Sequence, residues 1–173
     1  MHNTAYIAMG TNMPFLGVSG AALLRQAVAA LRAEGLAVQA ASGVWQTDAW
    51  PPGSKQPDYY NAVVSVGTVG LSPQAIYQKL RAIETAFGRA RREQWAARTL
   101  DLDIVAMNGL AGAFGELTVP HARMHERSFV LAPLAEIAPE WRHPHLGKTA
   151  AELLEALPGN GYRRVDDLAA GAG

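Results

Sequence analysis

Two aspartates separated by a single residue are the sharpest chemical feature of this sequence. They lie in the segment Arg98-Thr99-Leu100-Asp101-Leu102-Asp103-Ile104. Because successive side chains of a β-strand point to opposite faces, the apolar residues of this segment would enter the core, while Asp101 and Asp103 would project together from the other face. Two carboxylates so close repel each other unless a cation lies between them. The pair therefore predicts a site for metal ions that also bind phosphate oxygens, although an isolated pair of this kind is also compatible with a solvated strand face.

The stretch just before the aspartates is rich in arginine. Arg89, Arg91, Arg92 and Arg98 stand there against one glutamate, in a chain whose formal net charge is zero. The planar guanidinium group donates two parallel hydrogen bonds, which suits phosphate oxygens. An exposed charged loop would have the same composition. Because these arginines stand next to the acid pair, however, we interpret them as residues that bind a polyphosphate from the side opposite the metal ions.

A second cluster of basic residues runs from Pro120 to Arg127 and includes His121, Arg123 and His125. These side chains could contact phosphates, and the proline would hold the backbone extended before His121. A polar loop that leads into a helix would have the same pattern, so both interpretations stay open. We interpret three residues further along, namely Trp141, His143 and His145, as packing and surface residues.

The segment 47–61 predicts a lid and a site for a planar ring. It is a long loop that contains Trp50 and two consecutive prolines, and long loops in compact domains often close over active sites. Tyr59 and Asn61 alternate onto one face of the strand that follows. An aromatic ring can stack on a heterocycle while an amide pairs with its edge, although the two residues could also be an ordinary strand start.

The predicted elements that position these residues alternate between strands and helices. Strands are expected at 4–9, 38–45, 59–69 and 100–107, and helices at about 24–34, 73–87, 128–137 and 149–157. The order β-α-β-β-α-β is that of the ferredoxin-like split βαβ fold, an α+β class in which helices cover one face of an antiparallel sheet. We expect a single domain over 1–173, with helical additions near the C-terminus and a flexible tail from Asp166.

Composition narrows the functional classes. The chain has 173 residues, of which 49% are hydrophobic and none is cysteine. Disulfides, a thiolate nucleophile and structural zinc are therefore not expected, and a metal would be a hard ion such as Mg²⁺. Neutral net charge argues against binding to nucleic acid or to a membrane surface. The N-terminus has no signal-peptide pattern and no stretch is apolar enough to span a bilayer, so we expect a cytoplasmic protein.

Together these motifs resemble the 6-hydroxymethyl-7,8-dihydropterin pyrophosphokinase family of folate biosynthesis. The likeness spans residues 4–157 in the order that the family has, and the acid-pair segment together with Val119-Pro120-His121 makes it specific. The segments that carry it are Ala5-Tyr6-Ile7-Ala8-Met9-Gly10-Thr11-Asn12, Gln56-Pro57-Asp58-Tyr59-Tyr60-Asn61-Ala62, Ile83-Glu84, Gly88-Arg89, the segment 98–104, Leu117-Thr118-Val119-Pro120-His121 and Leu131-Ala132-Pro133-Leu134-Ala135-Glu136-Ile137-Ala138-Pro139.

The resemblance implies an enzyme that transfers pyrophosphate from ATP to the hydroxymethyl group of the reduced pterin and releases AMP. It implies two Mg²⁺ ions held by Asp101 and Asp103, a monomer, and no nucleic-acid or membrane partner. The roles that it assigns are catalytic for Arg89, Arg98, Asp101 and Asp103; ATP-binding for Glu84, Arg91, Trp95, Arg98, Ile104, Thr118, His121 and Arg127; and pterin-binding for Thr47, Tyr59, Asn61, Trp95 and Phe129.

The sequence departs from the family pattern at a few positions. Gln94, Ala96 and Ala97 stand where an arginine and Gly-Pro usually flank the tryptophan, the loop is one residue short, and Glu116 replaces a common arginine. We expect an active enzyme with altered loop kinetics, a view that equal ATP affinity in Gln94→Arg and the parent chain would contradict.

Two other functions compete with this interpretation. One is a nucleotidyltransferase of the polymerase-palm kind, which would need affinity for a nucleic acid strand. The other is a catalytically weakened nucleotide-binding module that acts as a partner or regulator. Neutral net charge disfavours the first, and the intact acid pair disfavours the second.

Overall fold

The structure, a computed structural model, describes residues 3–49, 52–88 and 99–168. Its strands are β1 (Thr4–Thr11), β2 (Ala37–Ala41), β3 (Gly43–Thr47), β4 (Tyr59–Gly67), β5 (Asp101–Met107), β6 (Gly112–Phe114), β7 (Leu117–Val119) and β8 (Tyr162–Asp167). Its helices are α1 (Gly20–Ala33), α2 (Pro73–Ala86), α3 (Ser128–Ile137) and α4 (Ala150–Glu155), with a 3₁₀ turn η1 (Met124–Glu126).

The main sheet has the strand order β5-β1-β4-β3-β8, with β2 also paired to β4, and the pairings between these strands are antiparallel. When β2 and β3 are taken as two parts of one strand, β5, β1, β4 and this composite strand are the fourth, first, third and second strands of a β-α-β-β-α-β unit. That is the ferredoxin-like arrangement, and the predicted α+β fold class is confirmed.

The second strand is broken, whereas the sequence predicted one strand over 38–45. Ser42 stands at the break, where its backbone N–H donates to the Val63 carbonyl at 2.9 Å. Its hydroxyl accepts a hydrogen bond from the Val63 N–H at 2.9 Å and donates one to the Gly43 carbonyl at 2.7 Å. Because a side-chain oxygen takes the place of a backbone partner, β2 and β3 bend around one point of β4.

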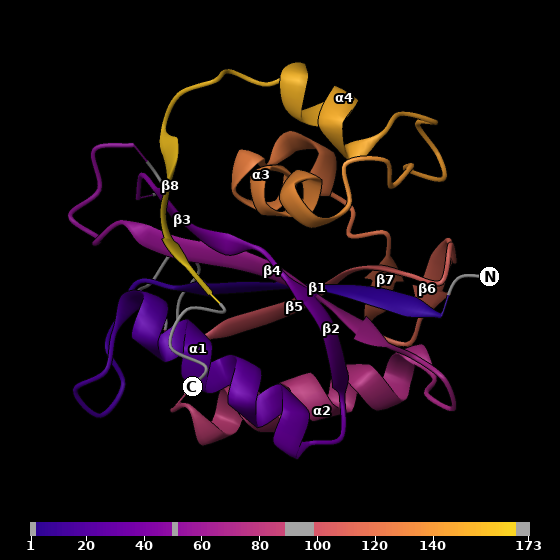
Figure 1. Ribbon diagram of the computed structural model, residues 1–173, viewed down its shortest axis with the longest axis horizontal. Coiled ribbons are helices and arrows are strands. Elements are labelled where there is room, and N and C mark those ends of the chain that lie inside the picture. Colours follow the sequence, from indigo (N-terminus) through magenta and orange to yellow (C-terminus); the bar gives the residue numbers. More distant parts are fainter. Residues whose placement is uncertain (1–2, 50–51, 89–98, 169–173) are drawn as a thin grey trace.

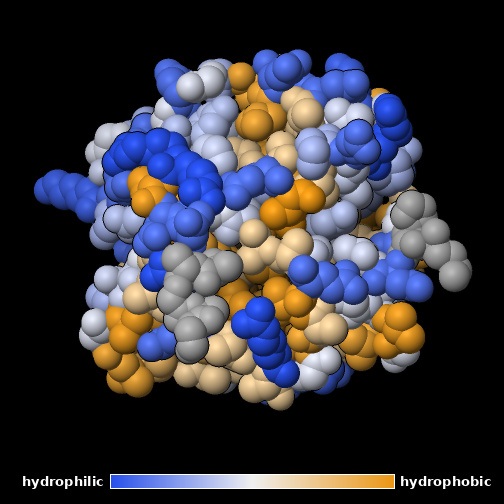
Figure 2. Space-filling model, viewed as in Figure 1, coloured by the Kyte–Doolittle hydropathy of each residue, from blue (hydrophilic) through white to orange (hydrophobic). Residues whose placement is uncertain are grey.

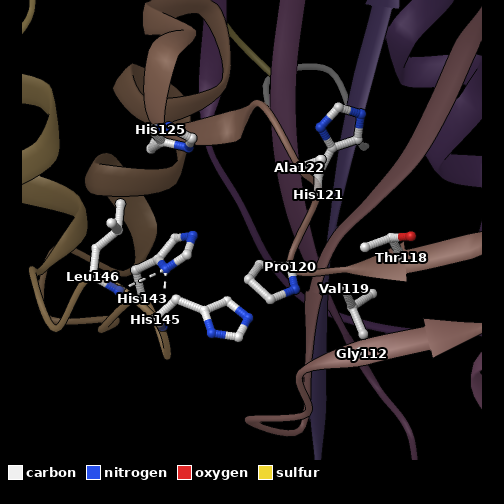
Figure 3. A pocket seen from close by; sticks show the side chains of 10 residues that line it. All are labelled: Gly112, Thr118, Val119, Pro120, His121, Ala122, His125, His143, His145 and Leu146. Carbon is white, nitrogen blue, oxygen red and sulfur yellow. Dashed lines mark hydrogen bonds between the residues drawn. The ribbon is translucent and has the colours of Figure 1, made fainter.

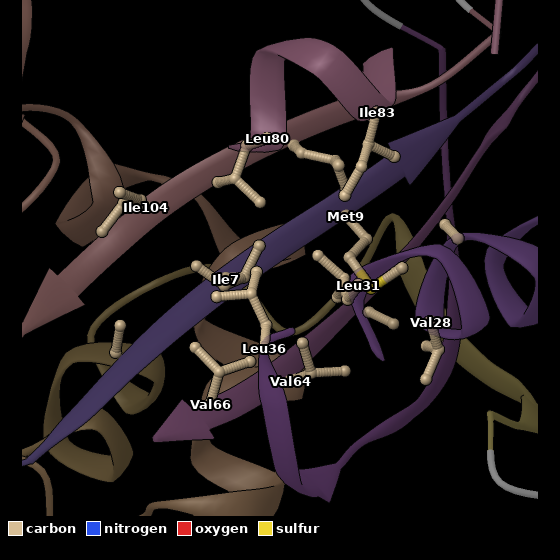
Figure 4. Close-up of a cluster of buried hydrophobic side chains, with 14 of the residues drawn as sticks. Ile7, Met9, Val28, Leu31, Leu36, Val64, Val66, Leu80, Ile83 and Ile104 are labelled. Carbon is tan, nitrogen blue, oxygen red and sulfur yellow. The ribbon is translucent and has the colours of Figure 1, made fainter. Parts of the chain in front are cut away.

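Helices cover both faces of the sheet (Figure 1). Helices α1 and α2 lie on one face, over a core that includes Ile7, Val64 and Ile104 (Figure 4). Helices α3 and α4 cover the other face, where Val63 and Val105 are buried. The prediction that helices cover one face was therefore wrong, and the run of buried apolar residues along β4 is typical of a strand that is packed on both sides.

Local signals mark several helix ends, although α1 begins at Gly20, four residues before the start predicted at about 24. The Ser72 hydroxyl accepts a hydrogen bond from the Ala75 N–H at 3.1 Å, and Pro73 begins α2. Gly35 follows α1 with a φ of 85°, in the left-handed region where glycine costs little. Thr149 and Glu152 form a capping box at the start of α4.

The C-terminal segment forms strand β8 on the far side of β3. Asp166 and Asp167 belong to this strand, and Arg25 forms an ion pair with Asp166 at 3.0 Å, so the flexible tail predicted from Asp166 is wrong for these two residues. Residues 169–173 lie outside the described part of the chain. The short hairpin β6–β7 was not predicted either.

On the surface shown in Figure 2, hydrophilic side chains surround smaller groups of hydrophobic ones. Within residues 3–49, 52–88 and 99–168, no helix combines the length and the apolar character that a membrane span needs.

Candidate active site

The acid pair lies on β5, an edge strand of the main sheet. Leu102 and Ile104 are buried in the core beneath α1 and α2, while Asp101 is half-buried and Asp103 is exposed. The alternation of a strand therefore directs both aspartates to the opposite face, as the sequence predicted. This is the face that α3 covers.

A row of residues crosses the sheet beside Asp101. The strand registers pair Asp101 with Gly10, Gly10 with Asn61, and Asn61 with Trp45. A Cβ atom on Gly10 would lie 3.0 Å from the Asn61 Oδ1, so any larger residue there would force this amide to move. The Asn61 Nδ2 in turn donates to the Thr47 Oγ1 at 2.9 Å. The amide is thus held on β4, with its Oδ1 side toward Gly10 of β1 and its Nδ2 side toward Thr47 of β3.

Thr47 pairs with Tyr59 on the neighbouring strand, so three of the four described residues that the sequence assigned to a pterin ring belong to one patch of the sheet. The fourth, Phe129, is in the first turn of α3 and has 36% of its surface exposed. The Arg127 guanidinium lies over the Phe129 ring, with 5.5 Å between its Cζ and the ring centroid.

Helix α3 is fixed to this patch through Glu136. Its carboxylate accepts hydrogen bonds from the Gly43 N–H at 2.8 Å and from the Trp45 Nε1 at 3.0 Å. It also forms an ion pair with Arg164 of β8 at 3.3 Å. One carboxylate therefore sets the position of α3 against both β3 and β8.

Asp103 is close enough to His121 and Arg127 to influence the pKa of both side chains. Burial lowers the pKa of His121, the Asp103 carboxylate opposes this shift, and Arg127 and Arg123 reinforce it. Burial also lowers the pKa of Arg127, while Asp103 raises it. The backbone N–H of His121 donates to the Val105 carbonyl at 2.8 Å, which fixes this segment along β5.

A pocket of about 210 Å³ lies along the outer edge of β5. Four of the residues that the sequence assigned to metal or ATP line it: Asp103, Ile104, Thr118 and His121. Glu84, another residue that the sequence assigned to ATP, lies beside the pocket and has a side chain that is 2% exposed. Its carboxylate accepts a hydrogen bond at 2.9 Å from the backbone N–H of Leu102, the residue between the two aspartates. The acid pair thus stands between this pocket and the patch formed by Thr47, Tyr59 and Asn61.

Three polar residues of this pocket were not predicted from the sequence, namely Tyr77, Arg81 and Glu116. Tyr77 and Arg81 stand seven and three residues before Glu84, which places them on one side of α2. That spacing is the signal in the sequence, and it lies on a different face of the helix from the apolar residues that predict α2. Glu116 had been noted only as a departure from the family pattern.

A second pocket, of about 350 Å³, is lined by four histidines, His121, His125, His143 and His145 (Figure 3). The His143 Nδ1 accepts hydrogen bonds from the backbone N–H groups of His145 and Leu146, both at 3.2 Å. Burial lowers the pKa of His143, and the neighbouring His125 and His145 lower it further. His143 therefore packs as a neutral ring, in line with its predicted packing role.

Several predicted site residues lie outside the described part of the chain. They are Arg89, Arg91, Trp95 and Arg98, together with the lid residue Trp50 and the departures Gln94, Ala96 and Ala97. Among the residues that the structure does describe, no group of three or more histidine, aspartate or glutamate side chains is arranged to hold a metal ion.

Residues 6–139 match the family described as 7,8-dihydro-6-hydroxymethylpterin-pyrophosphokinase. A relative from Synechocystis, named 2-amino-4-hydroxy-6-hydroxymethyldihydropteridine pyrophosphokinase, is 41% identical over 154 residues, 88% of this chain and 75% of that protein. A relative of the same name from Methylorubrum extorquens is 37% identical and covers 94% of this chain and 98% of its own.

Among solved structures, the chain resembles the crystal structure of Plasmodium falciparum HPPK-DHPS wild type with pteroate, with a TM-score of 0.67 and 14% identity. The match covers 90% of this chain but only 44% of that longer one, and at this identity it shows the fold alone. The family match and the relatives show more: this chain belongs to the 7,8-dihydro-6-hydroxymethylpterin-pyrophosphokinase family.

Proposed function

We propose that this protein transfers pyrophosphate from ATP to the hydroxymethyl group of 6-hydroxymethyl-7,8-dihydropterin, and that AMP leaves in the process. Family membership supports the reaction. The observation that carries the proposal is the position of the acid pair between a pocket along β5 and the patch of Thr47, Tyr59 and Asn61. In-line attack by the pterin hydroxyl on the β-phosphorus needs two substrates that meet at such a point.

Asp101 and Asp103 are the residues that would hold Mg²⁺, and we propose two ions. Carboxylate oxygens suit this hard cation, and the family reaction supplies phosphate oxygens for the coordination positions that the protein leaves open. When bound, such ions neutralise phosphate charge and hold the attacking and leaving oxygens near the phosphorus. The chain's own contribution is to direct both carboxylates to one face of β5.

His121 and Arg127 would bind the triphosphate beside Asp103. The His121 Nδ1 accepts a hydrogen bond from the Arg123 N–H at 3.2 Å, so the neutral ring carries its proton on Nε2. That N–H can donate to a phosphate oxygen while the nearby Arg127 supplies a full positive charge. Glu84, Ile104 and Thr118 would surround the rest of the nucleotide.

The pterin would lie over the sheet beside the acid pair. The Asn61 amide, held by Thr47, would pair with the edge of the ring, and Tyr59 and Phe129 would stack on its two faces. From the segment outside the described residues we propose the roles that the resemblance implies: Arg89, Arg91 and Arg98 at the phosphates, and Trp95 closing over both substrates to exclude water.

An assay of AMP release tests the proposal. The parent chain with ATP, Mg²⁺ and the pterin should release AMP, and the reaction without pterin should not. Asp103→Asn removes one carboxylate charge from the exposed face of β5 and should lower the rate at least about a hundredfold, since each 1.36 kcal/mol of lost stabilisation slows the reaction tenfold. Glu155→Gln, at the exposed end of α4, is the matched control and should keep the parental rate. A catalytically weakened module would instead bind ATP without releasing AMP, in which case the proposed function is wrong.

A further inference from the structure

The ladder between β3 and β4 ends at a pair of residues that belong to the pterin patch. Thr47 is the last residue of β3, Tyr59 is the first of β4, and the two are cross-strand partners. Their side chains share the face of the sheet that carries Asn61. The last pair of a ladder has a neighbouring pair on one side only, so it opens more easily than the pairs before it. A contact beyond the last pair would therefore help to keep the patch in its shape.

Gln46 supplies such a contact from the opposite face of the sheet. Because side chains alternate along a strand, Gln46 points away from the face of its neighbour Thr47. Its Nε2 donates to the Asp58 Oδ2 at 3.1 Å, which joins the residue before Thr47 to the residue before Tyr59. Gln46 pairs with Tyr60 in the register, so Asp58 is its diagonal neighbour across the two strands. The hydrogen bond thus closes the end of the ladder behind the patch.

Strand β8 holds the Gln46 amide in this orientation. The Arg163 Nη2 donates to the Gln46 Oε1 at 2.8 Å, and Arg163 is the register partner of Gln46 on β8. A guanidinium group only donates and a carboxylate only accepts, so the amide oxygen must face Arg163 and the amide nitrogen must face Asp58. Next to this contact, the Asp48 N–H donates to the Gly161 carbonyl at 3.1 Å. The end of β3 is therefore held by β8 on one side and by Asp58 on the other.

Burial ranks the two contacts of the Gln46 amide. Gln46 and Asp58 are half-buried, whereas Arg163 is exposed. Solvent weakens an exposed contact more than a partly buried one, so the hydrogen bond to Asp58 should contribute more than the one from Arg163.

We propose that Gln46, Asp58 and Arg163 are positioning residues of the pterin site. They act from behind the patch and keep Thr47 and Tyr59 in place before the ring arrives. A patch that already has its binding shape loses less conformational entropy on binding, so these contacts should affect the affinity for pterin and not the chemical step. The inference rests on the proposed function and extends it to three side chains outside the acid pair and the nucleotide pocket.

Steady-state measurement of AMP release, with each substrate varied in turn, tests the proposal. Gln46→Ala should raise the KM for pterin about fivefold, the loss expected for one hydrogen bond, and should leave kcat and the KM for ATP within about twofold. Arg163→Met should raise the KM for pterin by about twofold only. Gln39→Ala is the matched control, because Gln39 is an exposed residue of β2. A parental KM for pterin in a folded Gln46→Ala protein, or an equal rise in both KM values, would overturn the proposal.

An exchange of the two bridging groups separates this hydrogen bond from a general loss of stability. Gln46→Glu alone sets two carboxylates against each other and should raise the KM for pterin at least about fivefold. Asp58→Asn in the same chain places an amide donor opposite the new carboxylate, so the double variant should return to within about twofold of the parent. A double variant no better than Gln46→Glu would show that the bridge does not position the patch.

Amide hydrogen exchange followed by NMR gives a readout that needs no turnover. In Gln46→Ala the backbone amides of residues 47–49 and 59–61 should exchange several times faster than in the parent, while those of β1 keep their parental rates. A parent chain that released no AMP would contradict the proposed function, and the exchange rates would still test the bridge. Parental exchange rates in a variant of an active parent would overturn the positioning role and leave the proposed function intact.

Discussion

Gly10→Ala tests the packing of the pterin patch most directly. Gly10 has no positive φ, so alanine fits its backbone conformation, and the added Cβ would meet the Asn61 Oδ1 at 3.0 Å. An ordinary carbon–oxygen contact is about 3.4 Å or longer, so the amide must move by about 0.4 Å. Because β4 lies between β1 and β3, this movement presses the amide toward Thr47 and distorts the hydrogen bond from the Asn61 Nδ2 to the Thr47 Oγ1, now 2.9 Å long. Loss of one buried hydrogen bond of this kind costs about 1 kcal/mol.

We therefore expect Gly10→Ala to raise the KM for pterin about fivefold, the factor that corresponds to about 1 kcal/mol. The KM for ATP should stay within twofold, because the nucleotide pocket lies on the outer side of β5. Steady-state measurement of AMP release, with each substrate varied in turn, separates the two constants. The control is Gly67→Ala at the other end of the sheet, whose Cβ would meet the end of the exposed Gln39 side chain at 3.2 Å and the Ala37 Cβ at an ordinary 3.7 Å. A folded Gly10→Ala protein with a parental KM for pterin would refute the reasoning.

Further changes probe the rest of the molecule. The pKa of buried His143 is lowered, so the unfolded chain takes up the proton first as pH falls below about 6.5, and acidification destabilises the fold. The loss of thermal stability between pH 7.5 and 5.5 should therefore be smaller in His143→Asn than in the parent. Thr149→Ala breaks the capping box with Glu152 and should lower the free energy of unfolding by about 1 kcal/mol in urea titrations, with parental AMP release. Leu131→Ala leaves a hole under α3, where Leu131 is fully buried, and should cost about 2–5 kcal/mol in the same titrations.

The sequence predicted most of the fold because local signals and apolar periodicity agreed in most elements. Ser72-Pro73 begins α2 and the alternation around Asp101 and Asp103 forms β5, as predicted. Strand β8 was missed because it is an edge strand whose residues are mostly exposed, so no alternation of apolar side chains marks it. The break at Ser42 depends on a hydrogen bond to another strand, which no local pattern announces.

The parts of the site that could be predicted are those in which one short motif indicates a chemical role by itself. The acid pair and Asn61 stand out by residue type and spacing. The pocket residues Tyr77, Arg81 and Glu116 do not stand out in the sequence, because they come from α2 and from a hairpin that is distant along the chain. Individually these three residues are typical of any solvated helix or turn, and only their contacts with one another distinguish them.

The contacts of Glu136 bear on how the C-terminal region of this chain can be altered. Arg164 on β8 and Trp45 on β3 both bind this carboxylate, and the first turn of the same helix carries Phe129. A truncation that removed β8 would leave the Glu136 carboxylate without its Arg164 partner. The position of α3 against the sheet would then be less well fixed. Loss of β8 should therefore weaken pterin binding through the displaced helix α3 with Phe129 and through the lost pairing of Tyr162 with Thr47 of the patch.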